Sequence, residues 1–188
     1  MSFTGSMIKM PTNNKLSGFT LIELLIVIAV IGILAASVLT LINPFEQFAK
    51  ARDAERKKTL RELANGLERY YIKKGSYPQT SGIWFSSEPG DNASNNGGDW
   101  IPGLLASNEI TILPRDPQGG ATTIPTCSGW QRAYLYISDG SGACYKLLSH
   151  CAPEAAEAFS PTDAFYDPTR ETYAWMVCEP PGSVCCTY

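Results

Sequence analysis

Residues 15–42 read KLSGFTLIELLIVIAVIGILAASVLTLI, a long apolar stretch that decides the fold. From Phe19 to Ile42 its one charged side chain is Glu23. At 1.5 Å per helical residue this run is about 36 Å long, enough to cross a bilayer core of roughly 30 Å. The sequence therefore predicts a membrane-spanning helix that carries one carboxylate near its start.

A polar leader, residues 1–18, precedes this helix and ends in a small residue, Gly18. A secretory signal peptide has the opposite order, because its cleavage site follows a short apolar region. Cleavage after Gly18 would remove the leader and leave the apolar helix on the mature chain. We expect four parts: a leader (1–18), a membrane or filament-core helix (19–43), an amphipathic helix (44–74) and a globular head (75–188).

The string KLSGFTLIE, residues 15–23, resembles the class III signal of type IV prepilins and type II secretion pseudopilins. The resemblance implies cleavage between Gly18 and Phe19 by prepilin peptidase, N-methylation of Phe19, and use of Glu23 in filament assembly. It also implies the partners of such a subunit: further copies of the chain, an assembly platform in the inner membrane with its ATPase, and membrane lipid before assembly. The segments KGSYP (74–78) and LPRDP (113–117) match the family more loosely.

Glu23 is also unusual on physical grounds alone. A carboxylate inside an apolar helix costs about 2.5 to 3.5 kcal/mol on insertion scales and tends to mark a functional site. The apolar run contains no cation, so the candidate partner is the new α-amino group of Phe19, in the same chain or in a neighbouring subunit. The alternative is a local role, in which Glu23 caps the dipole of its own helix. The resemblance favours the role between subunits.

Two positions are expected to make the long helix flexible. Pro44 lacks an amide donor and clashes with the preceding turn, so Asn43-Pro44 should interrupt the helix. Gly32 is a weak helix former within the apolar run. The helix should then resume and stop near Gly75, a residue type common just past helix ends.

The resumed helix is predicted to pack on the head through an apolar stripe that includes Leu60, Leu63 and Leu67, at three- and four-residue spacing. Residues 50–58 are expected to be too polar for burial. In the head, residues 133–137 and 143–149 flank the turn sequence DGSG and predict a β-hairpin. Residues 172–178 are a third strand candidate, and a short helix is expected from Pro153 to Phe159. The fold class is α+β: a long N-terminal helix, half transmembrane and half amphipathic, packed on a C-terminal antiparallel sheet of three or four strands.

Six cysteines lie in the head, at Cys127, Cys144, Cys151, Cys178, Cys185 and Cys186. None forms a Cys-x-x-Cys pair and the chain has one histidine, His150, so no metal site is expected. The head lies outside the cytoplasm if the helix inserts with its positive leader inside, and an even count there predicts three disulfides. The pairing stays open. Since adjacent cysteines do not easily bond each other, Cys185 and Cys186 should each bond to a different part of the head.

The sequence shows no catalytic constellation and no cofactor motif, so we expect a protein that is not an enzyme. His150 has no acid or nucleophile at motif spacing and is expected to be structural. Calcium is the candidate ion, because Asp91, Asp99, Asp116 and the loop at Asp139 supply oxygen ligands. The EF-hand spacing is absent, and turn formation is the preferred role of these aspartates.

Charge is unevenly distributed along the chain. Residues 44–74 contain nine basic and five acidic side chains, whereas residues 75–188 contain four and twelve. Either basic and acidic faces of successive subunits meet in a filament, or the helix is solvated and held by pairs such as Lys58 with Glu62. The acidic head argues against binding of a nucleic-acid backbone, which needs clustered Lys and Arg.

We therefore expect a pilin, the structural subunit of a type IV pilus that serves adhesion, motility or DNA uptake. It would cross the cytoplasmic membrane once before assembly and lie in an extracellular filament afterwards. The first alternative is a pseudopilin of a type II secretion system, which the LPRDP segment favours, whereas the six cysteines and the long C-terminal extension favour the pilus. An alternative of another class is a membrane-tethered binding module or adhesin.

Overall fold

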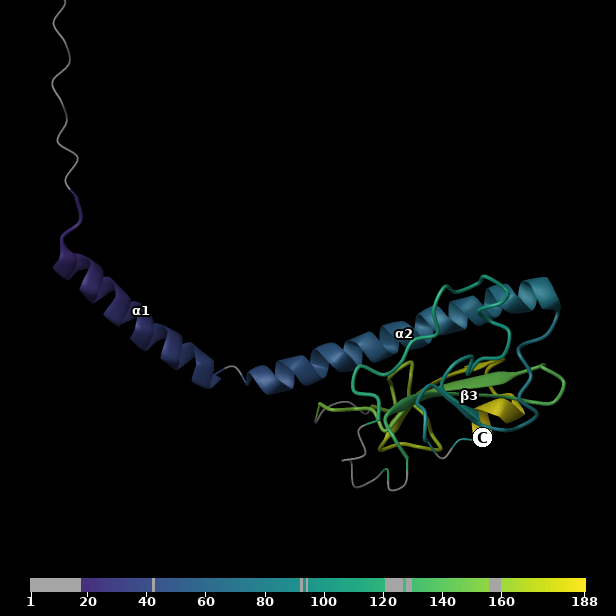
Figure 1. Cartoon of the computed structure of the whole chain (residues 1–188). Helices are drawn as coiled ribbons and strands as arrows, with labels where there is room; N and C mark the ends of the chain where they lie inside the picture. The colour runs from purple at the N-terminus through teal and green to yellow at the C-terminus, as the bar shows by residue number, and fades with distance from the viewer. Residues whose placement is uncertain are drawn as a thin grey trace, which may run out of the picture. The chain divides into compact units, whose positions relative to one another are not determined.

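The computed structural model describes residues 18–41, 43–91, 93, 95–120, 127, 130–155 and 160–188 (Figure 1). The chain forms two units, Met1–Asn43 and Pro44–Tyr188, which are considered separately. The expected leader, apart from Gly18, lies outside the described residues.

The first unit contains one helix, α1 (Leu21–Leu41), which runs through Gly32 without a break. Every side chain described in it is exposed. The second unit opens with α2 (Pro44–Lys74), so Pro44 is the first helical residue, a position where its missing N–H removes no hydrogen bond. The first helix thus ends at Leu41, and the second begins at Pro44.

Gly75 ends α2 as expected. Its φ of +75° lies in the left-handed region that glycine adopts without steric cost. Its N–H donates to the carbonyl oxygen of Tyr71 at 2.7 Å, which satisfies one of the last free carbonyls of the helix.

The head contains a five-stranded sheet in the order β2-β1-β3-β4-β5. The central hairpin pairs β3 (Ala133–Ser138) with β4 (Tyr145–His150), and β5 (Ala174–Glu179) adds beside β4. On the other side lie β1 (Phe85–Ser86), antiparallel to β3, and β2 (Asn95–Asn96), parallel to β1. The three predicted strands and the predicted antiparallel sheet of three or four strands are confirmed, since β1, β3, β4 and β5 are antiparallel neighbours. The two-residue strands β1 and β2 were not predicted individually. A short 3₁₀ helix, η2 (Val184–Thr187), follows β5.

α2 covers one face of the sheet (Figure 1). The predicted stripe is confirmed, because Leu60, Leu63 and Leu67 are buried against Tyr136 and Leu147 in one core cluster. Successive strand residues point to opposite faces, and a second cluster forms on the face away from α2. It consists of buried Ala133, Leu135, Leu148 and Ala174, with the partly buried Trp84, Trp130, Tyr173 and Met176 packed against it.

The expectation that residues 50–58 are too polar for burial is wrong. Asp53 and Arg56 are buried, with 6% and 0% of their surface exposed, because carboxylates and a guanidinium from distant parts of the head pair with them. The helix expected from Pro153 is also not present in its described part, residues 153–155, while residues 156–159 lie outside the described residues. The backbone N–H groups of Glu154 and Ala155 instead donate to the carboxylate of Asp53, at 3.0 Å each.

All six cysteines form disulfides: Cys127 with Cys151, Cys144 with Cys185, and Cys178 with Cys186. Their Cα atoms are 5.7, 5.8 and 5.4 Å apart. The expectation of a disulfide-bonded head is confirmed. Cys185 and Cys186 bond to different places, just before β4 and within β5, so they attach η2 to two neighbouring strands.

Candidate functional site

The start of α1 is organised by Thr20 and Glu23. The Thr20 N–H and hydroxyl donate to the Glu23 carboxylate at 2.9 and 2.7 Å, and the Glu23 N–H lies 3.3 Å from the Thr20 hydroxyl oxygen. This reciprocal arrangement is a capping box, which satisfies donors that a helix N-terminus leaves free. In the single chain Glu23 therefore has the local role. The Thr-x-x-Glu spacing of residues 20–23 is the sequence signal for this box.

The expected cleavage site lies outside α1. Gly18, Phe19 and Thr20 have no regular secondary structure and are exposed, and Phe19 is 86% exposed. An unstructured, exposed peptide bond is accessible to a peptidase, because no helical hydrogen bonds have to be broken first.

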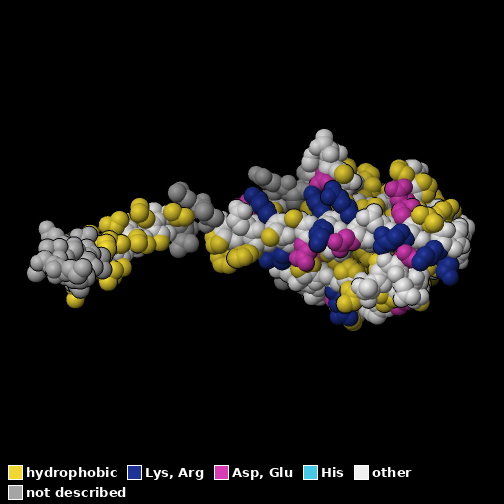
Figure 2. All heavy atoms as spheres, turned by 90° about the horizontal axis from the view of Figure 1, so that it is seen from above, with side chains coloured by type: hydrophobic (Ala, Val, Ile, Leu, Met, Phe, Trp, Pro, Cys, Tyr) yellow, Lys and Arg dark blue, Asp and Glu magenta, His cyan; other side chains and the backbone are white. Residues whose placement is uncertain are grey.

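The surface of α1 is apolar on all sides. Within α1, Leu21–Val38 is long and apolar enough to span a membrane, and none of that window is buried in the structure. On the face that Figure 2 shows, hydrophobic side chains cover much of the described part of this helix. A helix that is hydrophobic all round must be buried in lipid or among other apolar helices. α1 is therefore the part of the chain that needs an external partner.

A buried network of charges fastens α2 to the head. The Arg56 guanidinium binds Asp116 through two hydrogen bonds, from Nε at 2.6 Å and from Nη2 at 2.8 Å. It also lies 2.8 Å from Asp53 and 2.6 Å from Glu154. A guanidinium that donates two hydrogen bonds to one carboxylate forms a strong, geometrically specific ion pair. Asp116 belongs to the LPRDP segment, so this segment is held on α2 by Arg56.

Glu154 joins two further arginines to the network. Arg52 Nε lies 2.8 Å and Arg132 Nη1 2.9 Å from its carboxylate oxygens. Three cations thus face three carboxylates, which offsets the cost of removing them from water. Although burial raises the pKa of Glu154, the hydrogen bonds from Arg52 and Arg56 outweigh it and lower the pKa below its usual range.

Other cations of α2 are also paired with the head. Lys57 pairs with Asp163, and Arg69 lies 3.2 Å from Glu109, which also pairs with Lys73. The predicted surface pair of Lys58 and Glu62 is present at 3.5 Å. Much of the charge asymmetry between residues 44–74 and 75–188 is therefore used within one chain. The sequence did not reveal this, since the partners in the head lie 36 to 106 residues away along the chain.

The aspartates considered for calcium serve separate local purposes. Asp139 accepts hydrogen bonds from the backbone N–H groups of Ala143 and Cys144, so its predicted turn role is confirmed. Asp91 accepts from the Ser86 hydroxyl at 2.7 Å, and Asp99 from the Gly103 N–H at 3.0 Å. Asp116 binds Arg56, as described above. Among the described residues, each group with metal-ligand spacing includes disulfide-bonded cysteines, which are poor ligands.

His150 is buried at the end of β4. Its ring lies edge-on to Trp130 and to Tyr173, with ring centroids 5.3 and 5.4 Å away. Burial, with the nearby charge of Arg170, lowers the pKa of His150 to about 4. A neutral histidine enclosed by aromatic rings supports the structural role expected from the sequence.

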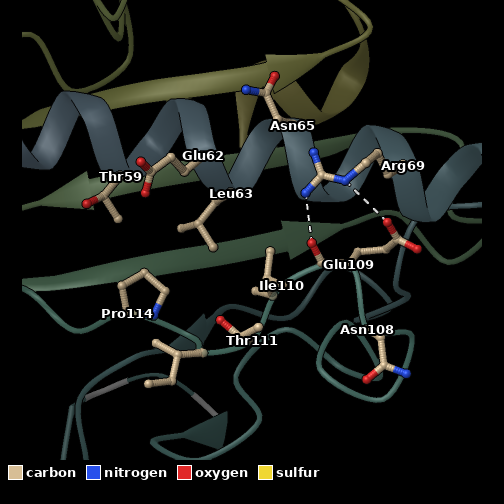
Figure 3. Close-up of a pocket in the computed structure, with 11 residues that line it drawn as sticks. Thr59, Glu62, Leu63, Asn65, Arg69, Asn108, Glu109, Ile110, Thr111 and Pro114 are labelled. Carbon is tan, nitrogen blue, oxygen red and sulfur yellow. Dashed lines mark hydrogen bonds and ion pairs between the residues drawn. The ribbon is translucent and has the colours of Figure 1, made fainter.

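A groove of about 470 Å³ runs between α2 and the segment 108–114 (Figure 3). Leu63 points into it from α2, and Ile110 points back from the loop. Ile112 and Pro114 extend the apolar lining, while Glu62 lies on the α2 side. Ile110 packs tightly on the helix: a Cβ added at Gly66 would lie 2.8 Å from its Cγ2 atom. At one end Arg69 donates to the Glu109 carbonyl oxygen at 2.7 Å.

The apolar helix α1 and the signal before it indicate a membrane-anchored, pilin-like protein, and comparisons with known proteins agree. Residues 13–39 match the model of the prokaryotic N-terminal methylation motif. The chain is 28% identical over 145 residues to the type II secretion system core protein G of Escherichia coli (strain K12), covering 74% of this chain and 84% of that protein. No solved structure matches it significantly.

The chain therefore carries the class III prepilin signal, and a type II secretion pseudopilin is a distant homologue of it. Type IV pilins and pseudopilins, which carry this signal, are structural proteins and not enzymes. The signal implies processing by prepilin peptidase and handling by an assembly machinery.

Proposed function

We propose that this chain is a pseudopilin, the repeating subunit of the filament of a type II secretion system. The observation that carries the proposal is the similarity to core protein G, because it covers 74% of this chain and 84% of that protein and so extends into the head. The sequence alone ranks the type IV pilus first, and the relative reverses that order.

The N-terminal residues have the first roles in this proposal. Prepilin peptidase cleaves between Gly18 and Phe19 and methylates the new amino group of Phe19. The Glu23 carboxylate of one subunit then pairs with that amino group on a neighbour, which removes both charges from the apolar core and sets the axial register. The capping box supports this sequence of events, since Thr20 satisfies the carboxylate until a neighbour arrives.

The apolar helix supplies the assembly surface. Before assembly α1 anchors the chain in the cytoplasmic membrane, and afterwards the α1 helices of many copies bundle as the filament core. A platform in the inner membrane and its ATPase provide the work of moving the helix out of lipid. Gly32 and the junction at Pro44 let residues 19–43 bend relative to the second unit, residues 44–188, during this transfer.

The rival function is a type IV pilus subunit. Three disulfides, two of which fix the C-terminal segment to β4 and β5, suit a head that stays exposed outside the cell. A membrane-tethered adhesin is the alternative function of another class. It accounts for an exposed head but not for the carboxylate of Glu23 within an apolar membrane anchor.

Deletion of the gene in the organism that encodes the chain separates these functions. A pseudopilin predicts that secreted proteins disappear from the medium and accumulate in the periplasm, with surface pili unchanged. Reintroducing the wild-type chain should restore secretion. Loss of surface pili with normal secretion would assign the chain to a pilus, and loss of surface attachment with both processes intact would assign it to a tethered adhesin.

A further inference from the structure

A pocket of about 300 Å³ lies on the face of the sheet away from α2. Two of the residues that line it, Leu135 of β3 and His150 of β4, are buried. The larger side chains that line it are half-buried: Trp84, Trp130, Arg170 and Tyr173. Clefts that hold small molecules have volumes of roughly 300 to 1,000 Å³, so this pocket has room for one ring of a small molecule.

Neighbouring contacts fix the aromatic residues of the pocket. Trp130 is close to Cys127, whose disulfide with Cys151 joins this segment to the residue after β4, and the Trp130 N–H donates to the Cys127 carbonyl oxygen at 2.9 Å. The Tyr173 N–H donates to the Arg170 carbonyl oxygen at 3.2 Å, in a turn just before β5. Both aromatic rings also lie edge-on to the imidazole described above. These side chains are therefore positioned before a ligand binds, which lowers the entropy cost of binding.

Arg170 brings hydrogen-bond donors to this aromatic pocket. Its guanidinium carbon lies 5.2 Å from the centre of the Trp84 ring, a cation–π contact. Its Nη1 donates to the Tyr188 carbonyl oxygen at 2.6 Å and to the Thr169 hydroxyl at 3.0 Å, and lies 3.5 Å from Asp167. A guanidinium has five N–H donors, and no bond to a described residue uses Nε or Nη2. Arg170 is thus held in place through Nη1 and keeps donors for a ligand.

We propose that this pocket binds one pyranose ring of a polysaccharide. The face of an aromatic ring is partly negative, and the C–H groups on the face of a pyranose ring are partly positive, so the two surfaces attract each other. The sugar hydroxyls accept hydrogen bonds from the donors of Arg170. The proposal goes beyond the filament role and does not depend on it, because the pocket and α2 lie on opposite faces of the sheet.

The residues of the pocket disfavour two other kinds of ligand. A cationic ligand would be repelled, because Arg170 lines the pocket and no carboxylate of the described residues does. A purely apolar ring, such as the side chain of a peptide phenylalanine, would take water from Arg170 and give it no acceptor, which costs binding free energy. A ring that is apolar on its faces and polar at its edge satisfies both requirements.

The indole N–H signals of the full-length chain test this directly, because two of its four tryptophans line the pocket. The chain is labelled with nitrogen-15 at tryptophan and kept in a detergent whose headgroup contains no sugar. Soluble oligomers of glucose, of N-acetylglucosamine and of galacturonate are added separately at millimolar concentration. We expect at least one of them to shift the signals of Trp84 and Trp130 until the pocket is saturated. The signals of Trp100 and Trp175, each with 1% of its surface exposed, should not move.

Variants connect these signals to the pocket. Trp130→Ala should weaken binding about tenfold, the order of loss when a stacking aromatic ring is removed, and Trp130→Phe, which keeps a smaller ring, should weaken it less. Val184→Ala, at an exposed apolar position outside the pocket, should leave the affinity unchanged. Unchanged positions of the Trp100 and Trp175 signals show that each variant is folded.

The oligomers also separate two sources of the same chemistry. A response to galacturonate alone would support the proposal with a carboxylate paired to Arg170, and a response to neutral oligomers would support it through stacking and hydroxyl contacts. Absence of a shift with all three oligomers would overturn the proposal. Equal affinity of Trp130→Ala and the wild-type chain, or a response only to a phenylalanine-containing peptide, would overturn it as well. None of these results depends on whether the chain forms filaments.

Discussion

Glu23 has a partner in its own chain, Thr20, and this decides which substitution tests its role. Glu23→Gln keeps an oxygen that can accept hydrogen bonds from Thr20 and removes the charge. If the charge pairs with the Phe19 amino group of a neighbour, Glu23→Gln is processed normally but filament yield falls at least tenfold. Thr20→Ala, which removes the cap at a cost of about 1 kcal/mol, should still assemble. Mass spectrometry and negative-stain microscopy of sheared material measure both, and normal assembly of Glu23→Gln would leave Glu23 with the capping role alone.

Arg56 is the other residue whose effect can be predicted individually. Replacing it with Met leaves Asp53, Asp116 and Glu154 with too few cations, and breaking such a buried network costs about 3 to 5 kcal/mol. The matched control is Lys58→Met on the same helix, which removes an exposed pair with Glu62 and should cost less than about 0.5 kcal/mol. Chemical denaturation of the full chain in detergent gives both values. Equal stability of the two variants would contradict the role assigned to the network.

At the scale of elements, the C-terminal segment depends on two disulfides of different span. Cys144 and Cys185 are 41 residues apart, whereas Cys178 and Cys186 are 8 apart. Since a cross-link that closes a longer loop removes more entropy from the unfolded chain, replacing the first pair with alanine should cost about 4 kcal/mol and the second about 2.5 kcal/mol. Denaturant midpoints of the two double variants measure the difference. The reverse order would show that packing of η2, and not loop closure, dominates.

Elements with a strong local signal were predictable, and those held by distant partners were not. The apolar run gave α1, the spacing of Leu60, Leu63 and Leu67 gave the buried side of α2, and alternation around the DGSG turn gave β3 and β4. β1 and β2 are two residues long, too short to show any alternation. The burial of Arg56 was not predicted, because its partners Asp116 and Glu154 lie far along the chain. A charged side chain is expected to be exposed to solvent unless a partner for it can be identified.

At the scale of the whole molecule, the chain separates surfaces that work within one copy from surfaces that need another. Charges of α2 are largely paired with the head, so they hold the fold together and contribute less to contacts between copies than the sequence suggested. The apolar surface of α1 has no such internal use in the described structure. Assembly should therefore rest on the apolar contacts of α1 and on the charge of Glu23.

The central claim is that this chain is a processed subunit of a filament. The most direct test is mass spectrometry of the N-terminal peptide of the chain recovered from purified filaments. The account predicts a peptide that begins at N-methylated Phe19, with residues 1–18 absent. A chain that keeps residues 1–18, or a processed chain found only in membranes and never in filaments, would contradict it.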